Sequence, residues 1–388
     1  MRIAYTEQQQ ALQAQVRRYF AQLMDVATRD ALDVHDAAAM RRVVKQMSVD
    51  GWLGLGWPRE FGGQGRGPVD QFIFYDEALI AGAPIPVIGV NLIGPTLLDA
   101  GTSEQKERFL PRILSGDDYY CVGYSEPGAG TDLAALSTAA RREGDTYVID
   151  GIKTWTSYVS CATHCWLAVR TDPSEPGRKG LSVIIVPMGT PGVAVTPLNL
   201  FNDHDGGTIE FDSVRVRADN LIGEPNNGWG VITRQLNYER ITMGAPGVFE
   251  RLYRDVRAWA AGVTLANGTT LLDVSWVRSH LAQVYVAIQL MRLMSWSNID
   301  DAANGLLKLE NVSATKVYAT ETGLSALNLL LEVMGNVGPL SKGDKAAVLS
   351  GRVESLYRHY SHMTFGGGAS EIQRELIASA CYGIQTSR

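Results

Sequence analysis

The chain of 388 residues has few cysteines and no long apolar run. Four cysteines are too few for the disulfide framework of a small secreted domain. No apolar run reaches the ~18 residues that a membrane span needs, and the polar start of the chain lacks the apolar segment of a signal peptide. With 35 basic against 41 acidic residues, the net charge of −6 argues against a protein that binds nucleic-acid phosphates. These absences predict a reducing, cytoplasmic setting with no nucleic-acid partner and no membrane span.

Two small groups of metal-ligating residue types occur in the chain. Cys161 and Cys165 flank His164, and His359 and His362 share one face of a predicted helix. The first group lacks a second ligand pair and the usual zinc spacing, and the second lacks a third ligand. We therefore expect no metal, and buried free thiols are the simpler interpretation of the cysteines.

Three stretches of the chain differ in their pattern. Residues 1–120 predict helices, the first of them capped by Thr6, whereas residues 121–228 predict short strands and tight turns. Residues 229–388 predict helices again. This order argues against an alternating α/β fold, and the central strands suggest a small barrel or a sandwich.

Several elements are predicted from local patterns. Residues 146–155 predict a β-hairpin, because two strand-forming runs flank Asp150-Gly151. Residues 183–186 and 208–211 predict further strands. Apolar residues recur at helical spacing along one segment: Val277, Leu281, Val284, Ile288 and Met291.

One glutamate lies on the apolar face of a predicted helix. Glu239 stands three residues after Leu236 and four before Met243. Glutamate is almost never fully buried unless it is paired. One interpretation is a structural carboxylate bonded to Arg240 or another basic group. The other is a general base whose pKa is raised toward neutral by burial.

Three further segments carry residues suited to binding a cofactor. Residues 124–132, YSEPGAGTD, combine hydroxyls with glycines that expose backbone N–H groups, as an anion-binding loop does, although an ordinary turn explains them equally well. The spacing matches neither a P-loop nor the dinucleotide fingerprint. Trp155 is either a core residue or a flat wall for an aromatic cofactor. Three glycines at 366–368 allow the backbone to approach another group closely.

Together with residues 51–63, GWLGLGWPREFGG, these segments resemble the acyl-CoA dehydrogenase family of FAD enzymes. The resemblance covers essentially the whole chain in order. It implies a mainly α-helical fold with a helical domain at 1–120, a central β-barrel at 121–228 and a four-helix bundle at 229–388. The implied reaction is α,β-dehydrogenation of an acyl-CoA to a trans-2-enoyl-CoA, in which a glutamate removes the α-proton and hydride passes to flavin N5.

The resemblance also implies site residues. Those expected to bind FAD are Tyr124, Ser125, Thr131, Trp155, Ser157, Gly367, Gly368 and Ala369. Thr131 would lie between the FAD diphosphate and the thioester end of CoA, and Arg240 would lie on the substrate side. Many members keep their base where this chain has Gly367, whereas a minority place a glutamate directly before an arginine on the first helix of the last domain. Glu239 occupies that second place, so the resemblance and the helix pattern select the same residue.

Departures from the family pattern concern the neighbouring subunit. Residues 262–270 lack the family's Arg-x-x-Phe-Gly, which reaches the neighbour's FAD, and Gly335-Asn336-Val337-Gly338 replaces its Gly-Gly-x-Gly. The resemblance therefore implies a heteromer with a paralogous subunit, an α2β2 tetramer, and an electron-transfer flavoprotein as acceptor. With residues 81–96 and 236–240, the chain is similar to the catalytic subunit of bacterial steroid side-chain dehydrogenases. That similarity implies a cholesterol-type CoA ester as substrate.

Other interpretations stay open at this point. The chain could be a homomeric dehydrogenase of short or branched acyl-CoA, or a flavin oxidase or monooxygenase on the same scaffold. From a different class, it could be a non-catalytic assembly subunit. Glu239 argues against a monooxygenase, which needs no α-proton base, and against an assembly subunit.

Overall fold

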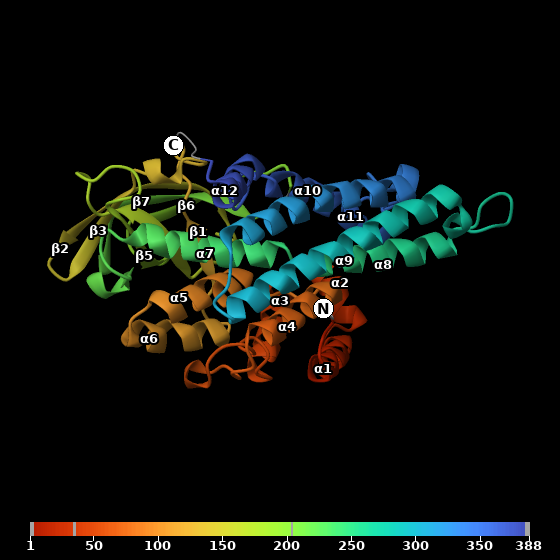
Figure 1. The fold of residues 1–388 in the computed structure, drawn as a ribbon, viewed down its shortest axis with the longest axis horizontal. Coiled ribbons are helices and arrows are strands. Elements are labelled where there is room, and N and C mark those ends of the chain that lie inside the picture. Colours follow the sequence, from red (N-terminus) through yellow and green to blue (C-terminus); the bar gives the residue numbers. More distant parts are fainter. Residues whose placement is uncertain (1–3, 34–35, 203–204, 385–388) are drawn as a thin grey trace. The chain divides into compact units, whose positions relative to one another are not determined.

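The computed structural model describes residues 4–33, 36–202 and 205–384. Contacts within the chain divide it into two compact units. The first unit consists of Met1–Gln46, Arg66–Ile85 and Arg240–Arg388, and the second of Met47–Gly65 and Pro86–Glu239. Each unit is described by itself below, with the elements labelled in Figure 1.

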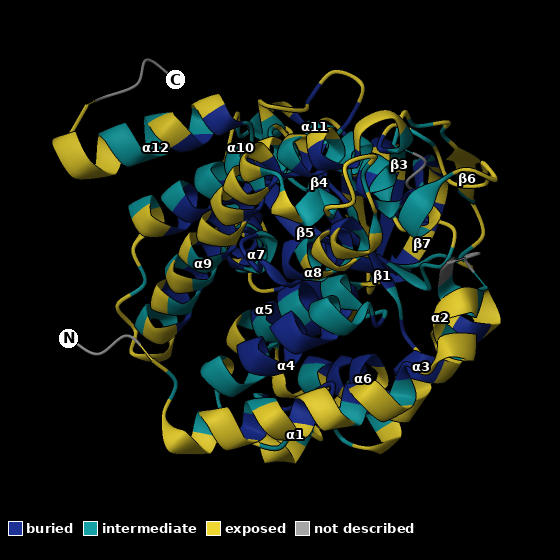
Figure 2. Cartoon of the chain, turned by 90° about the vertical axis from the view of Figure 1, so that its right-hand side faces the viewer, coloured by how far each residue is buried: buried dark blue, intermediate teal, exposed yellow. Residues whose placement is uncertain are grey.

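The first unit is helical. Its helices are α1 (Glu7–Leu23), α2 (Val26–Asp33), α3 (Ala37–Val49, up to residue 46), α4 (Pro68–Ala81), α8 (Gly247–Gly262), α9 (Ser275–Ala303), α10 (Leu309–Met334), α11 (Arg352–Met363) and α12 (Ser370–Tyr382). The predicted cap of the first helix is confirmed, because the Thr6 hydroxyl accepts from Gln9 N and the Gln9 side chain accepts from Thr6 N. Figure 2 shows α1 as a mostly exposed helix with a narrow buried stripe.

Four helices of this unit share one apolar core. The core draws Phe249 from α8, Leu327 from α10 and Tyr360 from α11. The residues of α9 predicted to form one face are all buried in it: Val277, Leu281, Val284, Ile288 and Met291. The helical spacing in the sequence therefore identified the packed face of α9, as expected for a helix with one side against a core.

A buried charge network joins three helices of the same unit. Arg292 of α9 donates to Asp76 of α4 at 3.1 Å and to Glu250 of α8 at 3.2 Å. Burial raises the pKa of Asp76, although the Arg292 charge opposes that effect. Because a buried charge is tolerated only when paired, Arg292 fixes how α4, α8 and α9 pack.

The second unit combines helices with a sheet. Its helices are α5 (Gly94–Ala100), α6 (Ser103–Leu114) and α7 (Gly228–Met243, up to residue 239). Its strands are β1 (Tyr120–Gly123), β2 (Ala139–Glu143), β3 (Thr146–Ser157), β4 (His164–Arg170), β5 (Leu181–Pro187), β6 (Val193–Pro197), β7 (Gly206–Arg217) and β8 (Leu221–Ile222). The strands predicted at 183–186 and 208–211 are confirmed as parts of β5 and β7.

The sheet is open, so the predicted β-barrel is wrong in its literal sense. The strand order is β6-β7-β3-β2-β4-β5-β8, and β1 pairs with β4. A barrel requires the first and last strands of this order to pair with each other. Here β8 has only two residues, and four of the five residues of β6 are exposed. Such edges offer too little backbone and too little apolar surface to close the sheet.

The predicted hairpin at 146–155 is also wrong. Residues 146–157 form one continuous strand, β3, which pairs with β7 along both halves. Gly151 is needed for close approach and not for a turn, because a Cβ there would lie 2.7 Å from the Thr138 Cα. The actual tight hairpin connects β2 to β3, where Glu143 pairs with Thr146.

Within the described ranges, no helix is both long and apolar enough to cross a membrane.

Candidate active site

The glycine-rich loop at 124–132 follows β1 in the second unit. Its turn is closed by two backbone hydrogen bonds between Glu126 and Ala129, of 2.9 and 3.1 Å. A Cβ built on Gly128 or Gly130 would meet no atom within 4 Å. Thr131 is exposed. The loop therefore presents open space and backbone groups at its tip, as a ligand-binding turn does.

A buried ion pair fixes the base of this loop. The Lys153 side chain is fully buried, and its ammonium lies 2.8 Å from a carboxylate oxygen of Glu126 and 3.0 Å from the Tyr124 carbonyl. Glu126 also accepts from the backbone N–H groups of Ser137 and Thr138, at 2.7 and 2.8 Å. Burial alone would raise the pKa of Glu126, but the Lys153 charge and these hydrogen bonds lower it to about 2.

Sequence analysis did not identify either member of this pair. The strand pattern did contain a signal for Lys153. Lys153 stands two and four positions after Gly151 and Ile149 in β3, so it lies on the same face of the strand as these two residues. Ile149 is buried, and Gly151 lies close to Thr138. A lysine on the inward face of a strand requires a buried acidic partner. The structure supplies that partner from 27 positions earlier in the chain.

Trp155 stands in a strained position beside the loop. Its φ of 60° is left-handed, which is uncommon for a bulky residue, and it lies where the β3–β7 register shifts. Its side chain is 64% exposed, so Trp155 is not a core residue. Thr154 N donates to the Ser125 carbonyl at 2.9 Å, which joins this bulge to the loop. Such strain is typical of a residue held in place for binding.

Thr156 and Ser157, which follow Trp155, are less exposed than the tryptophan. Ser157, at the end of β3, is half-buried. Thr156 is buried, and its hydroxyl oxygen has no hydrogen-bond partner among the residues that the structure describes. A buried hydroxyl of this kind can bond to a ligand in the adjacent space.

Glu239 belongs to the same unit as the loop and is half-buried on α7. Its carboxylate oxygen Oε2 accepts from Gln235 Nε2 at 3.0 Å. The phenol of Tyr124 accepts from the Trp166 indole at 3.1 Å. Burial raises the pKa of Tyr124, the Trp166 hydrogen bond opposes that effect, and the charge of Glu239 adds to it. The predicted base and the loop therefore belong to the same compact unit.

The predicted glycines near the C-terminus lie in the first unit, between α11 and α12. Gly367 and Gly368 have φ values of 65° and 100°, which other residues rarely adopt. A Cβ on Gly368 would lie 2.5 Å from Gln373 Nε2 and 3.6 Å from an Arg240 nitrogen. The Arg240 guanidinium therefore packs beside this turn. Ala369 is half-buried and precedes the first residue of α12.

The predicted site residues thus fall into two groups. Tyr124, Ser125, Thr131, Trp155, Ser157 and Glu239 belong to the second unit, and Arg240, Gly367, Gly368 and Ala369 belong to the first. Each group is assembled by contacts within its own unit. In the second unit the loop, the Trp155 bulge and α7 together offer an aromatic ring, backbone groups and a carboxylate.

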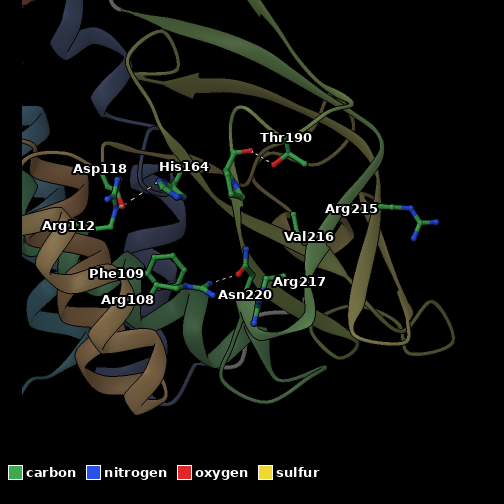
Figure 3. Close-up of a pocket in the computed structure, with 11 residues that line it drawn as sticks. Arg108, Phe109, Arg112, Asp118, His164, Thr190, Arg215, Val216, Arg217 and Asn220 are labelled. Carbon is green, nitrogen blue, oxygen red and sulfur yellow. Dashed lines mark hydrogen bonds and ion pairs between the residues drawn. The ribbon is translucent and has the colours of Figure 1, made fainter.

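A cavity elsewhere in the second unit has different properties (Figure 3). Its volume is about 340 Å³, and it is lined by Arg108, Phe109, Arg112, Asp118, His164, Pro187, Thr190, Arg215, Val216, Arg217 and Asn220. Arg112 is engaged with Asp118 at 2.8 Å, and Arg215 points away from the other side chains. The predicted site residues are not part of its lining, so this cavity is separate from the candidate active site.

The residue types singled out for metal binding have other contacts. His164 Nδ1 lies 2.9 Å from the Thr163 hydroxyl, and its ring stacks on Tyr120. Cys165 is buried opposite Cys121 on a neighbouring strand, so the buried-thiol interpretation is correct for these two. It is wrong for Cys161, which is half-buried, and for Cys381, which is exposed. No group of three or more metal-ligating side chains occurs in the part of the chain that the structure describes.

Comparisons with protein families match the chain almost from end to end. The family described as acyl-CoA dehydrogenase matches with its N-terminal domain at residues 6–117, its middle domain at 121–214 and its C-terminal domain at 226–382. Acyl-CoA dehydrogenase FadE26 of Mycobacterium tuberculosis is 43% identical over 395 residues, covering 99% of each chain. Acyl-CoA dehydrogenase FadE29 of the same organism is 39% identical, covering 100% of this chain and 99% of its own.

Solved structures show the same similarity. A chain of the ChsE4–ChsE5 complex from Mycobacterium tuberculosis matches with a TM-score of 0.91 and 43% identity, covering 100% of both chains. A chain of the Tcur3481–Tcur3483 steroid acyl-CoA dehydrogenase also matches with a TM-score of 0.91, at 41% identity and the same coverage. The first of these structures is described as a complex, and the name of the second also joins two components.

Proposed function

Because the chain belongs to the acyl-CoA dehydrogenase family, we propose that it oxidises the Cα–Cβ bond of an acyl-CoA thioester with Glu239 as the base. The observation that carries this assignment is the position of Glu239. It is half-buried on α7 in the same unit as the glycine-rich loop, and Gln235 donates a hydrogen bond to its carboxylate. A glutamate so placed can accept an α-proton from a substrate bound against the loop.

We propose FAD as the cofactor, and the residues present fit it. In the second unit, Trp155 offers an exposed ring, Thr156 a buried hydroxyl, and Gly128 and Gly130 open backbone. The proposed FAD contacts here are Tyr124, Ser125, Thr131, Trp155 and Ser157, and in the first unit Gly367, Gly368 and Ala369. When bound, FAD would supply the hydride acceptor.

This chain's own residues would divide the remaining tasks. Glu239 would take the α-proton. The Glu126–Lys153 pair would keep the loop in one conformation, so that its backbone groups are preorganised. Thr131 and Arg240 would contact the substrate. Trp155 would cover an apolar ring system with its exposed face.

We propose a steroid side-chain CoA ester as the substrate. The support is the similarity to a protein named a steroid acyl-CoA dehydrogenase, which extends over the whole of both chains at 41% identity. A steroid nucleus requires more space than a short acyl chain. A site built for the steroid ester should therefore prefer it when both substrates compete for the enzyme.

We further propose a heteromer with a paralogous subunit. One relative of full-length similarity is described as a complex, the name of another joins two components, and the segment 262–270 lacks the family residues that would complete a neighbour's FAD site. The face of α9 turned away from the core carries exposed apolar side chains: Tyr285, Val286, Leu290 and Leu293. A groove of about 450 Å³ lies between α9 and α10 beside them. Exposed apolar surface of this kind is typical of a protein interface.

Co-expression with the paralogous subunit tests the assembly. We expect a native mass of two copies of each chain with bound FAD, and low flavin content when this chain is expressed alone. A chain that purifies alone with one FAD per copy would contradict the heteromer and favour the homomeric dehydrogenase.

Anaerobic mixing of the assembled enzyme with acyl-CoA tests the reaction. Glu239→Gln should slow FAD reduction by ~10² or more if Glu239 is the base. Reduction by straight-chain acyl-CoA but not by a steroid CoA ester would remove the substrate assignment. An electron-transfer flavoprotein should reoxidise the enzyme, whereas rapid reoxidation by oxygen would indicate an oxidase.

A further inference from the structure

Gln235 is a fully buried amide that donates a hydrogen bond to the proposed base. It lies on α7 exactly one i, i+4 step before Glu239, so both side chains lie on the same face of the helix. Its Nε2 donates to Glu239 Oε2 at 3.0 Å. Both residues belong to the second unit, together with Tyr124 and the glycine-rich loop.

The charge of the acceptor and the exclusion of water both strengthen this hydrogen bond. A bond to an ionised group is stronger than one between neutral groups, and it strengthens further where water is excluded. Gln235 is 0% exposed, so water does not compete for its amide. An amide N–H therefore stabilises the ionised carboxylate more than the neutral carboxylic acid.

We propose that Gln235 is a positioning residue for Glu239, holding the carboxylate in place and favouring the ionised form that accepts the substrate's α-proton. This inference rests on the proposed function for its role in catalysis. The hydrogen bond between Gln235 and Glu239 is a feature of the structure and does not depend on the proposed function.

The unused end of the amide extends the argument. Gln235 Oε1 is buried and has no hydrogen-bond partner among the described residues. After proton transfer, Glu239 would be a carboxylic acid with an O–H to donate. A half-turn of the Gln235 amide would present Oε1 as the acceptor for that proton. Gln235 can therefore serve the base before and after it takes the α-proton.

The other titratable groups around Glu239 come from α7, from α5 and from the segment after β1. Tyr124, which follows β1, stays neutral because burial raises its pKa, and its hydroxyl accepts from the Trp166 indole. Arg240 follows Glu239 on α7. Arg234 and Tyr238 on the same helix are directed to Asp99 of α5, at 3.8 and 3.0 Å. Gln235 therefore differs from these groups, because it is a buried, neutral side chain that donates directly to the Glu239 carboxylate.

The variant Gln235→Met tests the proposal, because methionine keeps the side-chain length and loses the donor. The pKa of Glu239 is measured directly by 13C NMR of glutamate-labelled holoenzyme, with Glu239→Gln identifying the resonance. We expect the pKa to rise by about one unit, a tenfold change in the ionisation constant. The acid limb of the pH profile of FAD reduction should move upward by the same amount.

Thr233→Ala is the matched control. Thr233 is half-buried on the same helix, and its hydroxyl donates to the backbone carbonyls of Trp229 and Gly230, at 2.9 and 3.2 Å. Its loss should leave the Glu239 pKa unchanged. If Gln235→Met fails to fold, Gln235→Leu provides a second test, because leucine also lacks the donor and should raise the Glu239 pKa in the same direction.

The outcomes separate the inference from the proposed function. An unchanged Glu239 pKa in both Gln235 variants overturns the inference, even if Glu239→Gln abolishes FAD reduction. Normal FAD reduction by Glu239→Gln overturns the proposed base, while the NMR titration still reports whether Gln235 controls its ionisation.

Discussion

Replacement of Lys153 by methionine is the sharpest test of how the glycine-rich loop is held. The variant removes the ammonium that lies 2.8 Å from Glu126 and keeps the length of the side chain. The carboxylate stays buried, and it retains the N–H groups of Ser137 and Thr138 as its donors. Leaving one buried charge without its partner typically costs about 3–5 kcal/mol.

The pKa of Glu126 gives a second estimate of the stability that the buried pair contributes. Its lowering from 4.5 to about 2 corresponds to about 3 kcal/mol of stabilisation in the folded state. The Ser137 and Thr138 donors account for part of that value and remain in the variant, so we expect Lys153→Met to lower the free energy of unfolding by about 3 kcal/mol, the low end of the range for a buried charge left without its partner.

The pH dependence follows from the direction of this shift. A carboxylate with a depressed folded-state pKa contributes stability that is complete above about pH 4.5 and is lost as pH falls through about 2. The difference between the wild type and Lys153→Met should therefore be largest above pH 4.5 and should shrink in acid. Urea unfolding followed by tryptophan fluorescence measures it.

The reverse variant, Glu126→Gln, separates charge from packing. It leaves Lys153 buried without its carboxylate, and burial already lowers the pKa of Lys153 below its ordinary 10.5. Because the unfolded chain then binds more protons, the variant should gain stability as pH rises toward 10.5. The double variant should recover most of the loss. A cost below about 1 kcal/mol for Lys153→Met would refute the argument, since an exposed pair is worth that little.

Three further variants test single residues. Trp155→Gly should preserve or raise stability by relieving a φ of 60°, while the affinity for FAD, measured by flavin fluorescence, falls; retained affinity would remove Trp155 from the site. Gly368→Ala should lower thermal stability by about 1–3 kcal/mol, because its Cβ would lie 2.5 Å from Gln373 at a φ of 100°. Gly151→Ala should lower the unfolding free energy by a similar amount, because its Cβ meets the Thr138 backbone; a neutral effect would restore the interpretation of Gly151 as a turn residue.

The fold could be predicted from sequence where patterns are local. The face of α9 and the cap of α1 depend on residues within a few positions of each other, and both predictions are confirmed. The hairpin at 146–155 failed because Asp150-Gly151 also fits a continuous strand with a close neighbour. Only the pairing of β3 with β7, some 60 residues later, decides between the two.

The candidate site shows the same division. The motifs and the position of Glu239 on its helix identified the loop, Trp155 and the proposed base. The structure added Lys153 beneath the loop and Gln235 behind the base. Gln235 had a local signal, since it precedes Glu239 by four positions, but its complete burial depends on what packs against α7.

The sequence by itself determined the family, the order of helices and strands, and the choice of Glu239, because motif order and helical spacing are properties of the chain. Only the tertiary structure decided that the sheet stays open, that β3 is continuous and that Glu126 and Lys153 form a buried pair. These outcomes depend on which distant segments meet and on what is removed from water there. Burial and pairing of charges are set by that environment, so a linear pattern does not contain them.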